Sequence, residues 1–176
     1  MKKLRILIQI DGSNMYHRLK ELQLQNLSIF NYQALIQQIV NKDKLIAVKY
    51  YIGAIRAKEG NPKGKRLRKN QRRFLGNLQK QGFEIGFGHM LKTDKYHEKG
   101  VDVLLAADML IGAYEDLYDK IILISSDTDL LPAINKTKEL GKTVEYIGFS
   151  HKPSHAMIAN CSSSFLLRKQ DLERFL

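Results

Sequence analysis

The chain has 176 residues, of which 44% are hydrophobic and 27% are charged, as in an ordinary globular protein. We expect a single domain over residues 1–176. Its single cysteine, Cys161, excludes an internal disulfide and a zinc site made of cysteine thiolates. Lysine and arginine outnumber aspartate and glutamate by 29 to 18, and the net charge of +11 favours a polyanionic partner, either nucleic acid or anionic lipid.

The first part of the chain alternates between expected strands and helices. The apolar run Leu4–Ile10 predicts a strand that is covered on both faces. Ser13 or Asn14 can cap the helix that follows, and Asn31 can cap a second helix with one apolar stripe. Leu45–Ile55 is the second expected strand.

The middle of the chain begins with Gly60–Gly64, which has the composition of a loop. A polar helix is expected over about Leu67–Gln81, with Gly82 just past its end. Phe83–Phe87 is a short third strand, and a strongly apolar helix should run from Gly100 to about Tyr114.

The last part continues the alternation. Ile121–Ser125 is the fourth expected strand, and the helix Leu130–Leu140 carries Pro132 in its first turn, where proline is tolerated. Thr143–Ile147 is the fifth strand, and the tail from Ser150 onward should dock back on the core as a helix or strand. The alternation predicts an α/β fold, with right-handed βαβ units and helices on both faces of a parallel sheet.

Acidic side chains follow two of these strands at the point where each strand ends. Asp11 follows the first strand, and Asp127 and Asp129 follow the fourth. Asp11 could be merely a turn residue, and Asp127 or Asp129 could merely cap a helix, while the neighbouring Ser125 and Ser126 are interpreted as ordinary loop residues. However, ligands of open α/β sheets bind beyond the carboxyl ends of the strands, and crowded carboxylates repel one another unless a cation neutralises them. We therefore expect a site for Mg²⁺ or Mn²⁺.

Three more polar residues could belong to this site. Asp102 lies in the first turn of the helix that begins at Gly100, where the helix dipole alone would also favour an acid. Asn14 lies one turn beyond Asp11, so its amide can either reach the same crevice or cap the helix. Asp108 falls in the apolar stripe of its helix, so we expect a hydrogen-bonded supporting group there, not a ligand.

Three sequence blocks occur in a characteristic order: Ile10–Asn14, Lys99–Met109 and Ser125–Pro132. Together they resemble the NYN domains, which are PIN-like nucleases, and especially the LabA-like (DUF88) branch. The resemblance implies a three-layer αβα PIN-like fold with a central parallel sheet of about five strands in the order 3-2-1-4-5. It also implies divalent-metal-dependent cleavage of RNA that leaves a 5′-phosphate.

The family pattern also implies roles for single residues. The acids that coordinate metal in the family match Asp11, Asp102, Asp127 and Asp129. The asparagine near the family's first acid matches Asn14. The resemblance therefore implies that all five residues are catalytic.

This chain departs from the family pattern in two places. Ser126 stands where the family more often has glycine. The closing segment of the family commonly carries an acid before a phenylalanine, whereas residues 151–170 of this chain contain no acid. The second departure favours an alternative, a catalytically weak or inactive RNA-binding regulatory module of the same fold.

Much of the positive charge is concentrated between residues 56 and 73, which contain nine lysines and arginines and a single acid, Glu59. Such a run is often only a solvated helix face, but this density fits a surface that follows phosphates. Lys99 precedes Asp102 and could hold a substrate phosphate. The predicted nucleic-acid contacts are Lys65, Arg66, Arg68, Lys69, Arg72, Arg73 and Lys99. Tyr50, Tyr51, Phe74 and Tyr96 could stack on bases, although such aromatics more often belong to a core.

Other features narrow the function. The glycines of residues 82–88 do not form a dinucleotide fingerprint, and residues 60–65 do not form a P-loop. The chain lacks the roughly 18–20 apolar residues of a membrane span and a signal-peptide cleavage site, so we expect a cytoplasmic protein.

We therefore predict a Mg²⁺- or Mn²⁺-dependent ribonuclease for single-stranded or flexible RNA. The RNA-binding module stays open as an alternative, and so does a homodimer. A metal-dependent phosphatase would explain the acids but not the basic segment.

Overall fold

The computed structural model describes residues 3–24, 27, 30–55, 60–88, 90–92, 96–98 and 100–176. Within 90–92 and 96–98 only the backbone is described. The phosphate contact predicted for Lys99 lies outside the described residues, as do Arg56, Lys58 and Glu59 of the basic segment.

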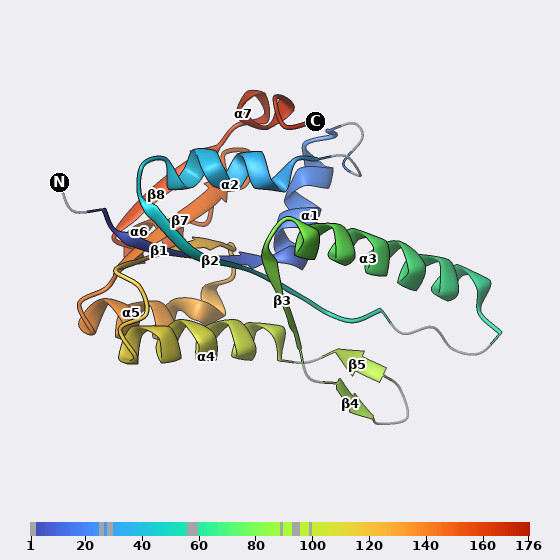
Figure 1. The fold of residues 1–176 in the computed structure, drawn as a ribbon, viewed down its shortest axis with the longest axis horizontal. Helices are drawn as coiled ribbons and strands as arrows, with labels where there is room; N and C mark the ends of the chain where they lie inside the picture. The colour runs from blue at the N-terminus through green and yellow to red at the C-terminus, as the bar shows by residue number, and fades with distance from the viewer. Residues whose placement is uncertain are drawn as a thin grey trace.

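A six-stranded sheet forms the centre of the molecule (Figure 1). In spatial order the strands are β3 (Phe83–Phe87), β2 (Lys44–Ile52), β1 (Arg5–Asp11), β6 (Lys120–Ile124), β7 (Thr143–Phe149) and β8 (Ser163–Leu167). All neighbouring pairs are parallel. Counted along the chain, the order is 3-2-1-4-5-6. The predicted parallel sheet in the order 3-2-1-4-5 is thus confirmed, and β8 adds a sixth strand at one edge.

Helices cover both faces of the sheet and complete a three-layer α/β fold (Figure 1). One face carries α1 (Gly12–Glu21), α2 (Tyr32–Val40), α3 (Pro62–Lys80) and α7 (Lys169–Glu173). The other face carries α4 (Val101–Tyr114), α5 (Leu131–Glu139) and α6 (His155–Asn160), and the short 3₁₀ helix η2 (Thr128–Leu130) precedes α5. None of the described helices combines the length and apolar character needed to cross a membrane.

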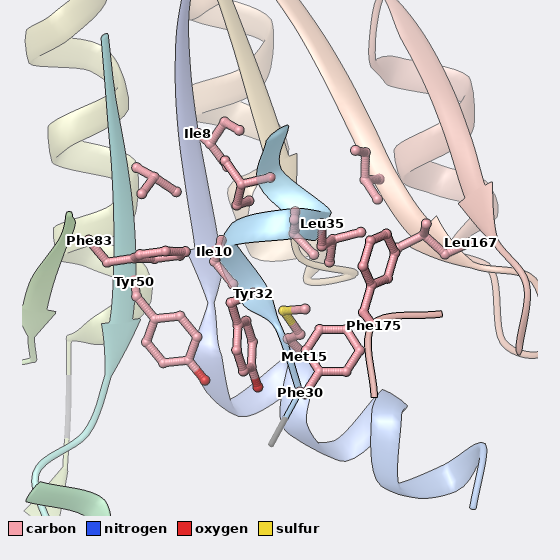
Figure 2. Packing of buried hydrophobic residues seen from close by; sticks show 14 of the residues in the cluster. Ile8, Ile10, Met15, Phe30, Tyr32, Leu35, Tyr50, Phe83, Leu167 and Phe175 are labelled. Carbon is pink, nitrogen blue, oxygen red and sulfur yellow. The ribbon is translucent and has the colours of Figure 1, made fainter. Parts of the chain in front are cut away.

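Strand β1 shows why the sheet is buried on both sides. Ile6, Ile8 and Ile10 pack toward α1 and α2, whereas Leu7 packs toward α4. Alternate residues of a strand point to opposite faces, so a strand between two helical layers must be apolar throughout. Figure 2 shows the α1–α2 side of this core, where Ile8 and Ile10 lie among Leu35, Phe175 and other buried residues.

The start of helix α3 differs from the prediction. Helix α3 begins at Pro62, not near Leu67, because the Asn61 side chain caps it by accepting a 3.0 Å hydrogen bond from the Gly64 N–H. The sequence Asn-Pro therefore marks a helix start, with proline at a position that needs no N–H donor. Most of the expected loop Gly60–Gly64 is thus helical.

The structure adds detail in two regions, the segment between β3 and α4 and the tail of the chain. The antiparallel strands β4 (Met90–Lys92) and β5 (Tyr96–Glu98), which the sequence did not predict, form a separate two-stranded sheet between β3 and α4 (Figure 1). The tail was expected to dock on the core, and it does so as α6, β8 and α7.

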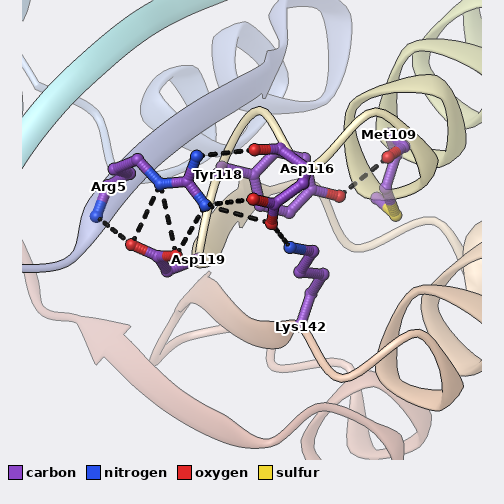
Figure 3. Close-up of polar contacts among 6 residues, drawn as sticks. All are labelled: Arg5, Met109, Asp116, Tyr118, Asp119 and Lys142. Atoms are coloured by element: carbon purple, nitrogen blue, oxygen red, sulfur yellow. Dashed lines mark hydrogen bonds and ion pairs between the residues drawn. The ribbon is translucent and has the colours of Figure 1, made fainter.

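An ion-pair cluster joins three segments at the amino-terminal end of the sheet (Figure 3). The Arg5 guanidinium donates to the carboxylate of Asp119 at 2.8 Å and to that of Asp116 at 3.0 Å, and Lys142 also pairs with Asp116. Hydrogen bonds from Lys142 and Arg5 lower the pKa of Asp116. The cluster ties the start of β1 to the segments that lead into β6 and β7, at the opposite end from the acids that follow β1 and β6.

We predict that Gly112→Ala destabilises the fold by about 1–3 kcal/mol. A Cβ at Gly112 of α4 would lie 2.8 Å from the ring of the buried Tyr118, whose hydroxyl donates to the Met109 carbonyl. Gly76→Ala in α3 is the matched control, because nothing lies within 4 Å of its added Cβ, and it should stabilise by about 0.5–1 kcal/mol through helix propensity. Urea unfolding measures both changes, and equal effects would contradict this packing.

Candidate active site

Strand β1 delivers Asp11 to the carboxyl end of the sheet, where the side chain is only 6% exposed. Its Oδ1 accepts a 2.9 Å hydrogen bond from the Asn14 N–H and so caps α1. Its Oδ2 accepts a 3.1 Å hydrogen bond from the Ser125 hydroxyl. The expectation that Ser13 or Asn14 caps α1 is therefore wrong, because the acid at the end of the strand is itself the cap.

Ser125 connects the acids that follow the two strands. Ile10 pairs with Ile124, so the next residues, Asp11 and Ser125, are neighbours beyond the sheet edge. The Ser125 hydroxyl donates to Asp11 and accepts a 3.2 Å hydrogen bond from the Asp127 N–H. Interpreting Ser125 as an ordinary loop residue missed this role, although its place directly after a strand that pairs with β1 could have indicated it.

Asp127 and Asp129 lie in the turn after Ser125. Asp127 is half-buried, and its Oδ1 accepts a 2.9 Å hydrogen bond from the Asp129 N–H, which caps η2. Asp129 is exposed. The capping explanation considered for this pair therefore holds for Asp127, but it leaves the Asp129 carboxylate and the second oxygen of Asp127 available to other groups.

Asp102 reaches the same edge from α4, which covers the face of the sheet opposite α1. Gly100 has a φ of 88°, a left-handed conformation that favours glycine, and it begins α4 so that Asp102 lies in the first turn. Burial raises the pKa of Asp102, and the charges of Asp127, Asp11 and Asp129 raise it further. Asp102 therefore lies within electrostatic reach of the other three predicted acids.

The pKa of Asp11 is also raised. Burial is the largest cause and the charge of Asp127 adds to it, while hydrogen bonds from Asn14, Ser125 and Ser13 act in the opposite direction. The folded state thus holds a buried carboxylate next to other carboxylates. This is the electrostatic condition that a bound cation relieves.

The donor set fits a hard divalent cation in its chemistry, because carboxylate oxygens are the ligands that Mg²⁺ and Mn²⁺ prefer. As the side chains lie here, no group of three His, Cys, Asp or Glu residues within the described part of the chain is placed to hold a metal ion. Asp102 and Asp129 are exposed, and exposed side chains change rotamer readily. Coordination by three acids would need such a rotation toward Asp11.

Two residues near the acids differ in how firmly they are held. Asn14 is half-buried in the first turn of α1, and across the described residues its side-chain amide makes no hydrogen bond. The fold thus brings Asn14 to the site, and its contact with substrate stays a prediction. The Ser126 hydroxyl is 3.0 Å from that of Tyr146, which accepts from the Ser154 N–H, so Ser126 anchors the turn to β7 and α6.

Gly12 is fixed by close packing. A Cβ there would lie 2.3 Å from the Tyr50 ring and 2.8 Å from the Tyr51 carbonyl oxygen. The Tyr50 hydroxyl donates to the Gly12 carbonyl at 3.3 Å. Any larger residue would therefore displace the chain directly after Asp11, which explains the Asp-Gly sequence better than turn formation does.

Asp108 lies on α4 and ties this helix to β2. Its Oδ2 accepts hydrogen bonds from the Tyr51 hydroxyl at 2.8 Å and from Lys49 at 3.2 Å. The Tyr51 hydroxyl in turn accepts from Gln9, which also donates to the Leu105 carbonyl. These contacts agree with the interpretation of Asp108 as a hydrogen-bonded supporting group. The network holds the helix that carries Asp102 against β1 and β2.

Helix α3 carries the predicted phosphate contacts. Its 19 residues include eight lysines and arginines and no acid. Figure 1 shows that its first turns extend beyond the sheet on the side where β2 ends. All six contacts predicted on α3 are exposed, and none of the ion pairs among the described residues involves this helix. The six residues are Lys65, Arg66, Arg68, Lys69, Arg72 and Arg73.

Two solved structures share this fold. A protein of unknown function from Vibrio parahaemolyticus has a TM-score of 0.72 and 22% identity, covering 96% of this chain and 98% of that chain. A structure of T5 5′-exonuclease with divalent zinc ions bound has a TM-score of 0.52 and 16% identity, covering 88% of this chain and 60% of that chain. At these identities the similarity shows the fold alone. Among curated proteins, no sequence matches the chain significantly.

The family is shown by the sequence itself. The NYN domain model matches residues 5–167, which is nearly the whole chain. The chain therefore belongs to the NYN domain family, and its three-layer PIN-like fold is confirmed. The narrower LabA-like assignment stays a prediction.

We predict that Asp11→Asn makes the protein more stable near neutral pH when divalent cations are removed with EDTA. A raised carboxyl pKa means that the folded state binds the proton more tightly than the unfolded state does. Asp11 therefore lowers stability as the pH rises through the ordinary aspartate pKa of about 3.9 toward the raised value in the fold. Asparagine keeps the cap and removes the charge.

Urea unfolding of both proteins across the acidic to neutral range measures this effect. The difference in free energy of unfolding should grow in favour of the variant as the pH rises, and then level off. A difference that grows in favour of the wild type would show that the fold stabilises the Asp11 anion.

Proposed function

We propose that this NYN domain is a divalent-metal-dependent ribonuclease that hydrolyses phosphodiester bonds in single-stranded or flexible RNA. The observation that supports this most strongly is the electrostatic coupling of Asp11, Asp102, Asp127 and Asp129 at the carboxyl edge of the sheet. Hydrogen bonds within the fold account for both carboxylate oxygens of Asp11 and for one oxygen of Asp127. They do not explain why four acids gather at this edge. A shared cation does.

These four aspartates would hold Mg²⁺ or Mn²⁺. When bound, such an ion supplies a water of lowered pKa and neutralises charge on the phosphate. The divalent ions in the T5 5′-exonuclease structure, which has the same fold, support a metal-dependent activity here.

The protein's own groups would divide the remaining tasks. Asp11 is buried and fixed by hydrogen bonds from α1 and Ser125, so it provides a ligand of defined position. Asp102 and Asp129 are exposed and can adjust to the substrate. Asn14, in the first turn of α1, would orient the scissile phosphate through its amide, which has no hydrogen-bond partner among the described residues.

The basic helix α3 supports a polymeric substrate over a small one. A small phosphoester would contact only the carboxyl edge of the sheet where the four aspartates lie, which we call the acid edge. A strand of RNA can extend from that edge along the exposed cations of α3. Binding that depends on several phosphate contacts is strong and depends on salt concentration. The phosphatase alternative leaves this helix without a role.

Two observations favour the alternative of an RNA-binding module with weak or no turnover. Within the described residues, no three acids are placed to hold a metal without side-chain movement. In addition, residues 151–170, which contain no acid, form α6 and the edge strand β8, two strands away from β6. Activity measurements separate the two functions.

We predict that the protein cleaves labelled single-stranded RNA in the presence of Mn²⁺, and that Asp127→Asn lowers the rate at least about 100-fold, as expected for loss of a ligand that stabilises transition-state charge. Cleavage is measured by gel electrophoresis of the labelled RNA. Glu173→Gln is the control, because it removes one negative charge from an exposed position on α7.

Intact RNA that nevertheless stays bound to wild-type protein would favour the binding module. Equal cleavage by wild type and Asp127→Asn would show that the activity comes from another site or another protein.

We also predict that the double variant Arg68→Gln/Arg72→Gln weakens RNA binding and flattens its salt dependence. The plot of log affinity against log salt concentration should lose about 0.7 of slope for each phosphate contact removed. The matched control is Lys42→Gln/Lys44→Gln, at exposed positions near the start of β2 and the opposite end of the sheet. Fluorescence anisotropy in EDTA measures both, and an unchanged slope in the α3 variant would remove α3 from the RNA path.

A further inference from the structure

A pocket of about 840 Å³ opens between α1 and α3, on the face of the sheet opposite α4. Its floor includes Tyr32 and Tyr50, which are 5% and 1% exposed. Its rim includes Tyr16 of α1 and Leu67 of α3, which are 50% and 43% exposed although their side chains are large and apolar. The floor therefore belongs to the core, whereas the rim presents apolar surface to solvent.

The floor is a rigid group of aromatic rings. Tyr32, Tyr50 and Phe74 contact one another edge to face, with ring centroids 5.6–6.1 Å apart. Figure 2 shows Tyr32 and Tyr50 side by side, with both hydroxyls directed toward the end of the sheet where α1 begins. Burial raises the pKa of Tyr32 to about 12 and also raises that of Tyr50, so both hydroxyls stay neutral at physiological pH.

The pocket adjoins the acid edge through α1. The Tyr50 hydroxyl donates to the carbonyl of Gly12, the residue directly after Asp11. Tyr16 lies one helical turn beyond Gly12 on the same helix. A strand with one phosphate at the acids would therefore need to cross only the first turn of α1 to reach the pocket.

Helix α3 forms one wall of the pocket. The residues of α3 that line the pocket are mainly uncharged, and include Leu67, Asn70, Phe74 and Asn77. On a 3.6-residue period most of the eight cations of α3 lie on the rest of its circumference, and Arg73 borders the pocket. An apolar hollow beside cations complements a flat base next to an anionic phosphate.

The wall is also held in place. The Gln71 side chain donates to the Gly53 carbonyl at 2.6 Å and accepts from the Ile55 N–H at 2.8 Å. These two hydrogen bonds fasten α3 to the segment that leaves β2. The α3 wall of the pocket is thus held in place before any ligand binds.

We propose that this pocket binds one base of a single-stranded RNA whose phosphates lie along α3 and whose scissile phosphate lies at the four acids. The base stacks on Tyr16 and packs against Leu67 and Phe74, and Arg73 pairs with a neighbouring phosphate. This inference rests on the proposed function and deepens it by assigning a base subsite on the face of the sheet opposite Asp102.

The test measures equilibrium binding in EDTA, so that it does not depend on cleavage. One probe is a short fluorescent single-stranded RNA, and the other is the same backbone with abasic sites in place of its bases. The wild type should bind the base-containing probe about 5- to 100-fold more tightly than the abasic one, as expected for one stacked base. Tyr16→Ala should lose most of this preference while binding the abasic probe as the wild type does.

Tyr114→Ala is the matched control, because Tyr114 is 63% exposed on α4 and lies outside the pocket. Leu67→Ala is a second pocket variant, and thermal unfolding shows that each variant is folded. If the wild type binds both probes equally, or if Tyr114→Ala loses as much preference as Tyr16→Ala, the base subsite is wrong and the proposed function stands. If the wild type binds neither probe, both the proposed function and the subsite are wrong.

Discussion

The buried carboxylate of Asp11 is the constraint on which the rest of the site depends. One of its oxygens begins α1 by accepting the Asn14 N–H, and the other accepts the Ser125 hydroxyl, which in turn accepts the Asp127 N–H. One side chain thereby joins β1, α1 and the turn after β6. The same burial raises its pKa, because the hydrogen bonds to the carboxylate offset the loss of hydration only in part. Such a conflict between stability and local charge is characteristic of functional sites.

The surrounding structure supports this arrangement from both faces of the sheet. On the α1 side, Tyr50 packs against Gly12 and leaves no space for a larger residue after Asp11. On the α4 side, Tyr51 and Lys49 bind Asp108 and hold the helix that carries Asp102. Tyr50 and Tyr51 are consecutive residues of β2 and point to opposite faces of the sheet. One strand therefore fixes both α1 and α4, the helices that border the acids. Core packing and acid geometry are thus properties of the same few residues.

Much of the fold follows from local patterns, because buried parallel strands are apolar throughout and acids placed directly after β1 and β6 must share one edge. The remainder depends on hydrogen bonds between distant segments, which no local pattern contains. Ser125 resembles any loop serine until its strand is known to pair with β1. The cap of α1 differs from the prediction because an acid before a glycine also suits a turn or a metal ligand, and the start of α3 differs because Asn61 and Pro62 also suit a loop. The strands β4 and β5 have three residues each, too few for a recognisable alternation.

We propose that Asp11, Asp102, Asp127 and Asp129 form one cluster that binds a divalent cation. Equilibrium binding of Mn²⁺, followed by its electron paramagnetic resonance signal, tests this claim without any nucleic acid. We expect saturable Mn²⁺ binding to the wild type at neutral pH. In Asp102→Asn the affinity should fall at least about tenfold, because the change is expected to remove one oxygen ligand but no core contact. Absence of saturable Mn²⁺ binding to the wild type, or equal binding by Asp102→Asn, would contradict it.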